Sequence, residues 1–211
     1  MNDSGGLRER KKIATREALS AAAFRLALEH GPDNVRVDDI AEAAGVSPRT
    51  YNNYFASREQ AIVAAVVAER ALRIGAALRA RPAGEPLADA VVEAVVEQYC
   101  EPAGDALLLI TSAPGLRAAF VDAVVSIEQP LAAAIAARTG GAGDAATTVL
   151  AAAVSAAARV AVERWVRPAG ERAGPNNLLV VTGGSLADIL REALAHVAPA
   201  LAAYESRRQP S

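Results

Sequence analysis

A short polar segment near the start of the chain carries side chains that suit contacts with nucleic-acid bases and phosphates. Arginine can donate two hydrogen bonds to guanine, and asparagine can pair in the same two-bonded way with adenine. The hydroxyl groups of serine, threonine and tyrosine can hold phosphate oxygens. Such residues, with one proline among them, follow one another closely at Ser47, Pro48, Arg49, Thr50, Asn52, Asn53 and Tyr54. The segment therefore predicts a polar contact surface, provided that one element presents these side chains together.

Two short helices joined by a tight turn would position this segment. Val37–Ala44 has apolar residues at helical spacing. Gly45 follows at the point where a turn needs a left-handed residue, and Ser47 with Pro48 is typical of the start of a second helix. A helix-turn-helix places its second helix in the major groove of DNA. An ordinary helical hairpin with a polar outer face is the alternative that the pattern leaves open.

A basic segment precedes this motif. Between residues 7 and 16 one acidic side chain, Glu9, stands against the basic residues Arg8, Arg10, Lys11, Lys12 and Arg16. The whole chain has a net charge of -2, but a local basic cluster can still bind phosphate. We expect Lys11 and Lys12 to contact phosphates, and a solvated helix start is the alternative.

The rest of the chain also has helical periodicity, so the predicted fold class is all-α. Helices are expected over about 7–30, 37–44, 48–54, 57–79, 87–101, 105–112, 114–139 with a kink at Pro130, 144–167 and 185–204. We divide them into a three-helix domain at 7–56 and a larger helical bundle at 57–204. Ser57 and Gln60 resemble a capping box that starts the helix shared by both.

Several function classes find no support in the sequence. The single cysteine, Cys100, excludes an internal disulfide and any site with several cysteine ligands, and the only histidines, His30 and His196, have no metal-ligand spacing. A G-x-S-x-G motif is absent, and the glycine-rich run at 139–146 lacks the lysine of a phosphate-binding loop. We therefore predict neither an enzyme nor a cofactor.

The start of the chain and its most apolar run bear on location. The first residues lack the apolar core of a signal peptide. The run from Thr147 to Val166 is mainly alanine and is interrupted by Arg159 and Glu163, so it falls short of a membrane span. We expect a soluble, cytoplasmic protein that does not use a membrane.

The segment from Thr15 to Ile62 resembles the DNA-binding domain of TetR-family transcriptional regulators. The resemblance is carried by the runs Asp39-Ile40-Ala41, Gly45-Val46-Ser47 and Ser57-Arg58-Glu59, with Thr50 and Tyr54-Phe55. It implies contacts to bases and phosphates from Ser47, Pro48 and Arg49, and to phosphate from Thr50, Tyr54, Arg58 and Arg36. Asn53 matches a variable position that faces the groove. The family often has an aromatic residue where this chain has Asn52, so we expect Tyr51 to pack inward and Asn52 to point outward.

The same resemblance implies an effector site and a dimer interface in the larger domain. The aromatic residues expected at the effector site are Tyr99, Phe120 and Trp165. The dimer residues expected from the last amphipathic stripe are Leu186, Ile189, Leu190, Leu194 and Val197. Each set could instead be core of a single chain. The segment 112–140 further resembles a subgroup that binds acyl-CoA-like ligands.

The predicted function is a dimeric, ligand-responsive DNA-binding regulator. Its partners would be a second copy of the chain, a near-palindromic double-stranded operator and a small hydrophobic effector that releases the repressor from DNA. Two alternatives stay open: a helical-bundle protein or enzyme that binds small molecules without DNA, and a helical scaffold that binds a partner through its last stripe.

Overall fold

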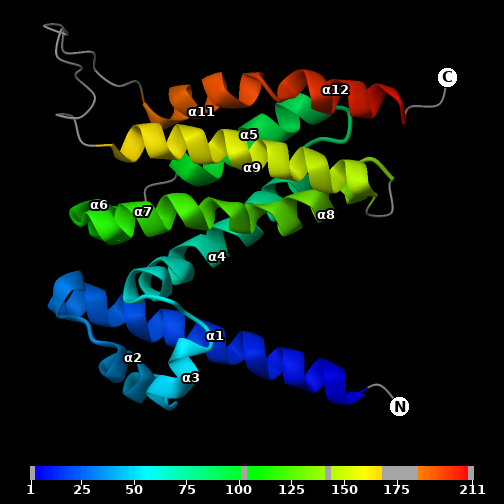
Figure 1. The fold of residues 1–211 in the computed structure, drawn as a ribbon. Helices are drawn as coiled ribbons and strands as arrows, with labels where there is room; N and C mark the ends of the chain where they lie inside the picture. The colour runs from blue at the N-terminus through cyan, green and yellow to red at the C-terminus, as the bar shows by residue number, and fades with distance from the viewer. Residues whose placement is uncertain (1–2, 101–103, 141–143, 168–184, 209–211) are drawn as a thin grey trace, which may run out of the picture. The chain divides into compact units, whose positions relative to one another are not determined.

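The computed structural model describes residues 3–100, 104–140, 144–167 and 185–208. Regular structure in these ranges is helical throughout, which confirms the all-α prediction (Figure 1). The elements are α1 (Asp3–His30), η1 (Pro32–Asn34), α2 (Val37–Ala43), α3 (Pro48–Asn52), α4 (Arg58–Ala80), α5 (Leu87–Cys100), α6 (Gly104–Ser112), α7 (Pro114–Ala123), η2 (Val124–Ile127), α8 (Glu128–Arg138), α9 (Ala145–Val166), α11 (Leu186–Ala195) and α12 (Ala198–Ser206). The connection expected at 168–184 lies outside the described residues.

The helices form two compact units. The first comprises Met1–Val67 and Gly104–Ala123, and the second comprises Ala68–Ala103 and Val124–Ser211. The helix α4 contributes its N-terminal part to the first unit and its C-terminal part to the second. The division differs from consecutive segments at 7–56 and 57–204, because α6 and α7 group with the N-terminal helices.

The first unit is built on α1, against which α2 packs (Figure 1). Leu19, Ala23 and Ala27 recur at helical spacing on α1 and are buried together with Ile40 of α2. Gly31 ends α1 with a φ of 79°, in the region that glycine adopts without a steric penalty. The chain can therefore turn at once into η1 and α2.

The second unit is organised around α9, which packs against both α8 and α11 (Figure 1). The helix α5 packs against α11 and α12. The core of the second unit is aliphatic and rich in small residues. Its fully buried side chains include Leu78, Leu87, Ala94, Leu131, Ile135, Val154, Ala158 and Leu190. Small residues let these helices approach closely.

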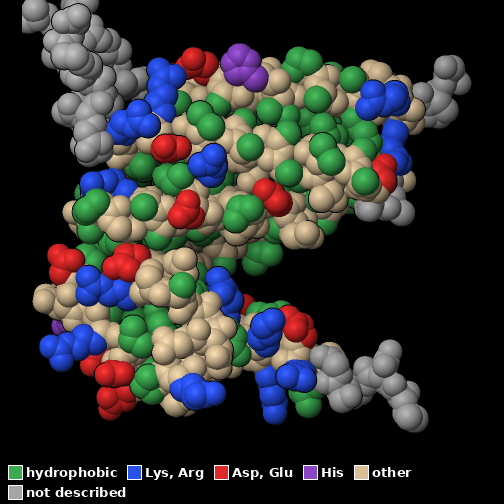
Figure 2. Space-filling view, viewed as in Figure 1, with side chains coloured by type: hydrophobic (Ala, Val, Ile, Leu, Met, Phe, Trp, Pro, Cys, Tyr) green, Lys and Arg blue, Asp and Glu red, His purple; other side chains and the backbone are tan. Residues whose placement is uncertain are grey.

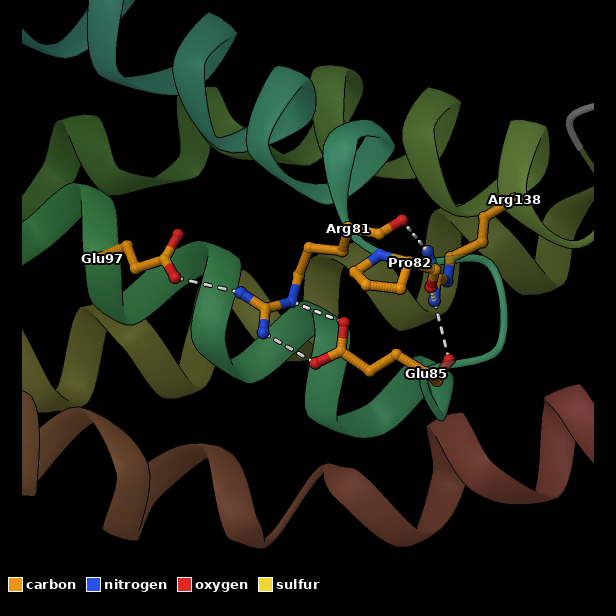
Figure 3. Close-up of polar contacts among 5 residues, drawn as sticks. All are labelled: Arg81, Pro82, Glu85, Glu97 and Arg138. Atoms are coloured by element: carbon orange, nitrogen blue, oxygen red, sulfur yellow. Dashed lines mark hydrogen bonds and ion pairs between the residues drawn. The ribbon is translucent and has the colours of Figure 1, made fainter.

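An arginine at the end of α8 fastens the turn between α4 and α5 (Figure 3). Arg138 donates to the carbonyl oxygens of Arg81, Pro82 and Glu85 at 3.1, 2.5 and 2.7 Å. Arg81 in turn makes two hydrogen bonds of 2.7 Å to the Glu85 carboxylate and one of 3.0 Å to Glu97. Because Arg81 donates to it, the Glu85 carboxyl has a pKa below its ordinary value. Both arginines therefore stabilise the turn between α4 and α5.

Two prolines act differently from the sequence-based prediction. The sequence predicts a kink at Pro130, and this position is wrong. The irregular stretch is η2 at Val124–Ile127, and Pro130 lies in the first turn of α8. A missing N–H costs nothing in the first turn of a helix. The single helix expected over 185–204 is divided into α11 and α12, because Pro199 cannot continue an α-helical hydrogen-bond ladder.

Two helical stretches, Pro114–Arg138 and Ala145–Val166, are long and apolar enough by composition to cross a membrane, with 39% and 44% of their apolar windows buried. The first is interrupted by η2. The second is α9, whose packing against α8 and α11 accounts for its buried apolar residues. Membrane crossing is therefore not needed to explain either stretch.

Gly75 of α4 lies close to the backbone of Pro130 on α8, so a larger side chain there should destabilise the second unit. A Cβ at Gly75 would lie 3.1 Å from the Pro130 carbonyl oxygen, a backbone atom that cannot swing away. We expect Gly75→Val to lower the free energy of unfolding by about 1–3 kcal/mol, because overpacking outweighs the helix propensity gained. Urea denaturation followed by circular dichroism measures this.

The neighbouring exposed residue Ala76 provides the control, since Ala76→Val adds a β-branched side chain at an open position of the same helix. Its cost should stay within about 0.6 kcal/mol. Equal losses in the two variants would show that the approach to Pro130 is not tight.

Candidate nucleic-acid interface

The turn before α3 is set by backbone geometry. Gly45 has a φ of 68°, and the N–H of Val46 donates to the carbonyl of Ala41 at 2.9 Å. Ser47 then caps α3, because its hydroxyl accepts from the N–H of Thr50 at 3.1 Å and lies 2.9 Å from the Thr50 hydroxyl. The predicted helix start at Ser47 and Pro48 is confirmed.

One residue anchors α3 and leaves its neighbours exposed. Tyr51 is buried, and its hydroxyl donates to the carbonyl of Ser57 at 2.8 Å. Burial, and secondly the negative charge of Glu59, raise the pKa of Tyr51 to about 12. Asn52 is exposed, as are Arg49 and Asn53. The inward tyrosine and outward asparagine are therefore as predicted.

A groove of about 600 Å³ brings the basic segment and α3 together. Its lining comes from two parts of the chain that are far apart in sequence: Arg8, Glu9, Lys11, Lys12 and Thr15 of α1, and Thr50, Asn53 and Tyr54 at α3. Lysine and arginine side chains gather along the N-terminal part of α1 in Figure 2. The groove combines cations with hydroxyl and amide groups, which is the chemistry that holds a phosphate backbone. We name it the α1–α3 groove.

Only some of the predicted contact residues line this groove. Lys11, Lys12, Thr50, Asn53 and Tyr54 line it, and Arg8 and Thr15 join them although the sequence did not single them out as contacts. Arg8 could have been found from its place in the basic segment. The remaining predicted residues lie outside the groove lining: Arg36, Ser47, Pro48, Arg49, Asn52 and Arg58.

Arg16 braces α1 against the end of α3. Its guanidinium donates to the carbonyl of Tyr54 at 3.1 Å and lies 4.6 Å from the centre of the Phe55 ring. A cation over an aromatic face is attracted by the ring quadrupole. Arg16 therefore fixes the distance between the basic segment and α3, although the sequence marked it only as part of the basic segment.

Arg58 has partners within its own unit. Its guanidinium donates to the carbonyls of Asp33 and Val35 at 2.9 and 3.2 Å and to the Glu59 carboxylate at 2.8 Å. Burial alone would raise the pKa of Glu59, but hydrogen bonds from Arg58 and others keep it below its ordinary value. Arg58 thus ties α4 to the η1–α2 connection, and its predicted phosphate contact stays a prediction.

The three predicted effector residues divide between the two units. Tyr99 on α5 and Trp165 on α9 belong to the second unit, whereas Phe120 on α7 belongs to the first. Tyr99 and Phe120 are buried, and Trp165 is partly exposed. A joint role for all three in one pocket stays a prediction. Within the described ranges no three His, Cys, Asp or Glu side chains gather in a way that could hold a metal ion.

The predicted dimer residues lie mostly inside the protomer. Leu190 and Leu194 are 0% and 1% exposed and Ile189 is 6% exposed, so they pack against the chain's own helices and correspond to the intrachain-core alternative. Leu186 and Val197 are partly exposed and stay available. Apolar residues missed by the prediction recur at helical spacing on the outer face of α9: Val149, Ala153, Ala156 and Val160. Hydrophobic side chains are visible along α9 in Figure 2. We name these four residues the α9 outer face.

Family models match most of the chain. The model described as bacterial regulatory proteins, tetR family, matches residues 19–65, which contain α2 and α3. The model of the MftR C-terminal domain matches residues 85–202.

The chain is also similar to individual known proteins. The HTH-type transcriptional regulator TcmR of Streptomyces glaucescens is 37% identical over 147 residues, a match that covers 64% of this chain and 65% of the length of that relative. Thermus thermophilus FadR, a TetR-family transcriptional repressor solved with lauroyl-CoA, is 20% identical with a TM-score of 0.45, over 86% of this chain and 92% of that one. A TetR-family regulator from Streptomyces coelicolor is 16% identical with a TM-score of 0.43, over 93% and 90% of the two chains.

Proposed function

Because the chain belongs to the TetR family of bacterial regulators, we propose that it is a dimeric repressor that leaves its operator DNA when a small hydrophobic effector binds. The observation that carries the proposal is the α1–α3 groove. There Lys11 and Lys12 lie with Thr50 and Tyr54, so cations and hydroxyl groups from distant parts of the chain face the same space.

The proposal assigns different tasks to the exposed side chains. With α3 in the major groove, the exposed side chains of Arg49 and Asn52 reach base edges. The residues of the α1–α3 groove hold the phosphates beside that site, and Arg36, exposed before α2, extends the phosphate contact. No catalytic step is assigned to any residue. The protein would act in the cytoplasm, where operator DNA is.

The two classes of contact should differ in their response to salt. On DNA from the region upstream of its own gene, Lys11→Ala with Lys12→Ala should weaken binding to all sequences and reduce the slope of log affinity against log salt by about 2. Arg49→Ala should cost about 1–3 kcal/mol on the specific site and leave non-specific binding nearly unchanged. Gel shifts over a series of salt concentrations measure both effects.

Absence of any shift at low salt would contradict the proposal and favour a helical-bundle protein that binds small molecules without DNA. An equal loss for Arg49→Ala on every sequence would assign Arg49 to phosphate contacts.

Dimerisation is proposed through the α9 outer face together with the exposed flank of α11. Val149 and Val160 are 66% and 54% exposed in the lone protomer, and Leu186 and Val197 lie partly exposed on and after the adjacent helix α11. Pairing would remove this apolar surface from water. A dimer would also present two α3 helices to successive major grooves about 34 Å apart.

The effector would bind in the second unit, which carries most of the match to the C-terminal family model. For release to occur, the effector must bind the conformation with low DNA affinity more tightly than the other. An acyl-CoA-like effector stays a prediction from the resemblance of segment 112–140.

A further inference from the structure

The peptide group of Tyr54, just after α3, is held from both sides. Its N–H donates to the carbonyl of Tyr51 at 2.8 Å, and its carbonyl accepts from Nη1 of Arg16 at 3.1 Å. Tyr51 is itself buried and bonded to the carbonyl of Ser57. The backbone of Tyr54 is therefore tied both to the anchor of α3 and to α1.

The side chain of Tyr54 lines the α1–α3 groove, so the position of its backbone matters for that groove. A group that is already held in its binding geometry loses less freedom when its partner arrives. Arg16 comes from 38 residues earlier in the chain, so its hydrogen bond sets the place of Tyr54 relative to α1. Lys12 and Thr15 of the same helix form the facing side of the groove.

Arg16 uses its planar group in a way that suits positioning. Its guanidinium lies 4.6 Å from the centre of the Phe55 ring while it donates to the carbonyl of Tyr54. Phe55 is buried, so the ring is a fixed platform for this contact. Arg16 is exposed but lies outside the groove lining. These contacts favour a role through Tyr54 over a phosphate contact made by Arg16 itself.

We propose that Arg16 is a positioning residue for DNA binding, which holds the Tyr54 backbone so that the Tyr54 hydroxyl meets a phosphate at the α1–α3 groove. The inference rests on the proposed function, because that phosphate belongs to the operator. It separates Arg16 from Lys11 and Lys12 of the same basic segment, which act on phosphates through their own charges.

A double-mutant cycle on DNA from the region upstream of the gene tests this, with gel shifts as the measurement. Arg16→Lys keeps the positive charge, but an ammonium group lacks the planar fork that stacks on Phe55 and donates to Tyr54 together. Tyr54→Phe removes only the hydroxyl. Each single change should weaken binding about fivefold. Because Arg16 acts through that hydroxyl, the double variant should bind within about twofold of Tyr54→Phe, whereas independent effects would multiply to about 25-fold.

Two other roles of Arg16 predict different results. A direct phosphate contact would survive in Arg16→Lys, because lysine also binds phosphate as a point charge. A role in stability alone would lower the melting temperature and would multiply with the effect of Tyr54→Phe. We expect every variant to melt within about 3 °C of the wild type, since substitutions of exposed side chains change stability little.

Arg25→Lys is the matched control, because Arg25 is an exposed arginine of α1 whose ion pair with Glu29 stays within that helix. It should bind DNA as the wild type does. Wild-type binding by Arg16→Lys, or effects of Arg16→Lys and Tyr54→Phe that multiply, would overturn the inference and leave the proposed function standing. Absence of a shift by the wild-type protein at low salt would instead contradict the proposed function, and the inference with it.

Discussion

Replacing Tyr51 with alanine is expected to destabilise the first unit strongly and to weaken operator binding. Tyr51 is 1% exposed, its ring centre lies 5.8 Å from that of Phe55, and its hydroxyl bonds to the carbonyl of Ser57. It therefore joins α3 to the start of α4 through both packing and a hydrogen bond. The exposed contact residues of α3 keep their positions only while this anchor holds.

The magnitude follows from the groups removed. Truncating a buried aromatic residue to alanine costs about 3–5 kcal/mol, and the lost hydrogen bond adds about 0.5–1.5 kcal/mol. Domains of this size are stable by about 5–15 kcal/mol in total, so the loss takes a large part of that stability. Urea unfolding followed by circular dichroism, together with gel shifts, measures both consequences.

Tyr51→Phe separates the hydrogen bond from the packing and should cost only about 1 kcal/mol. It also tests a pH dependence. The folded-state pKa of Tyr51 is raised to about 12 from an ordinary value of 10.0, so its contribution to stability is complete below pH 10 and is lost as the pH rises toward 12. The phenylalanine variant should lack that part of the alkaline loss.

The neighbouring tyrosine is the matched control. Tyr54 is partly exposed and lines the α1–α3 groove, so Tyr54→Ala should leave the unit folded and weaken DNA binding. Equal destabilisation by Tyr51→Ala and Tyr54→Ala would mean that Tyr51 is no special anchor.

Local features of this fold could be predicted because they depend on neighbouring residues. Ser47, Asp144 and Ser185 stand at the starts of three predicted helices, and each side chain accepts a hydrogen bond from the N–H three residues on. The capping box is confirmed in part. The hydroxyl of Ser57 accepts from the N–H of Gln60, while the Gln60 side chain accepts from Ala56. Short-range chemistry of this kind is readable from spacing alone.

Features that depend on distant residues could not be predicted in this way. Periodicity showed that Leu190 and Leu194 form an apolar stripe, but a stripe is the same whether a helix of its own chain or a second copy covers it. The family pattern predicts a phosphate contact for Arg58, but it gave no sign that the Arg58 guanidinium also donates to the carbonyls of Asp33 and Val35. Both outcomes depend on which segments meet after folding.

The grouping of α6 and α7 with the N-terminal helices also depends on contacts between residues that are distant in the sequence. A Cβ at Gly115 of α7 would lie 3.2 Å from Cγ of Glu59, so glycine allows α7 to approach the start of α4 closely. Glu59 is also the residue to which Arg58 donates. Gly115 and Glu59 are far apart in the sequence, and no pattern in either segment predicts that they lie close together.

The α9 outer face gives the second large expected effect, since Val160→Glu should convert the dimer to a monomer. Val160 is 54% exposed in the protomer, so a glutamate there stays solvated in the monomer and leaves its fold intact. A two-fold interface brings the same face of both copies together, so each dimer would bury two unpaired carboxylates. Sedimentation velocity at micromolar concentration should show the loss of the dimer.

Operator affinity should fall with the dimer. Two linked recognition helices gain about 10²–10⁴ in affinity over one, and a monomer lacks that gain. Val125→Glu is the matched control, because Val125 lies on η2 of the same unit, is also 54% exposed and is not one of the four residues of the α9 outer face. It should remain dimeric and bind the operator as the wild type does. A dimeric Val160→Glu protein with unchanged operator affinity would exclude the α9 outer face and move the interface to other exposed residues, such as Leu186 and Val197 at α11.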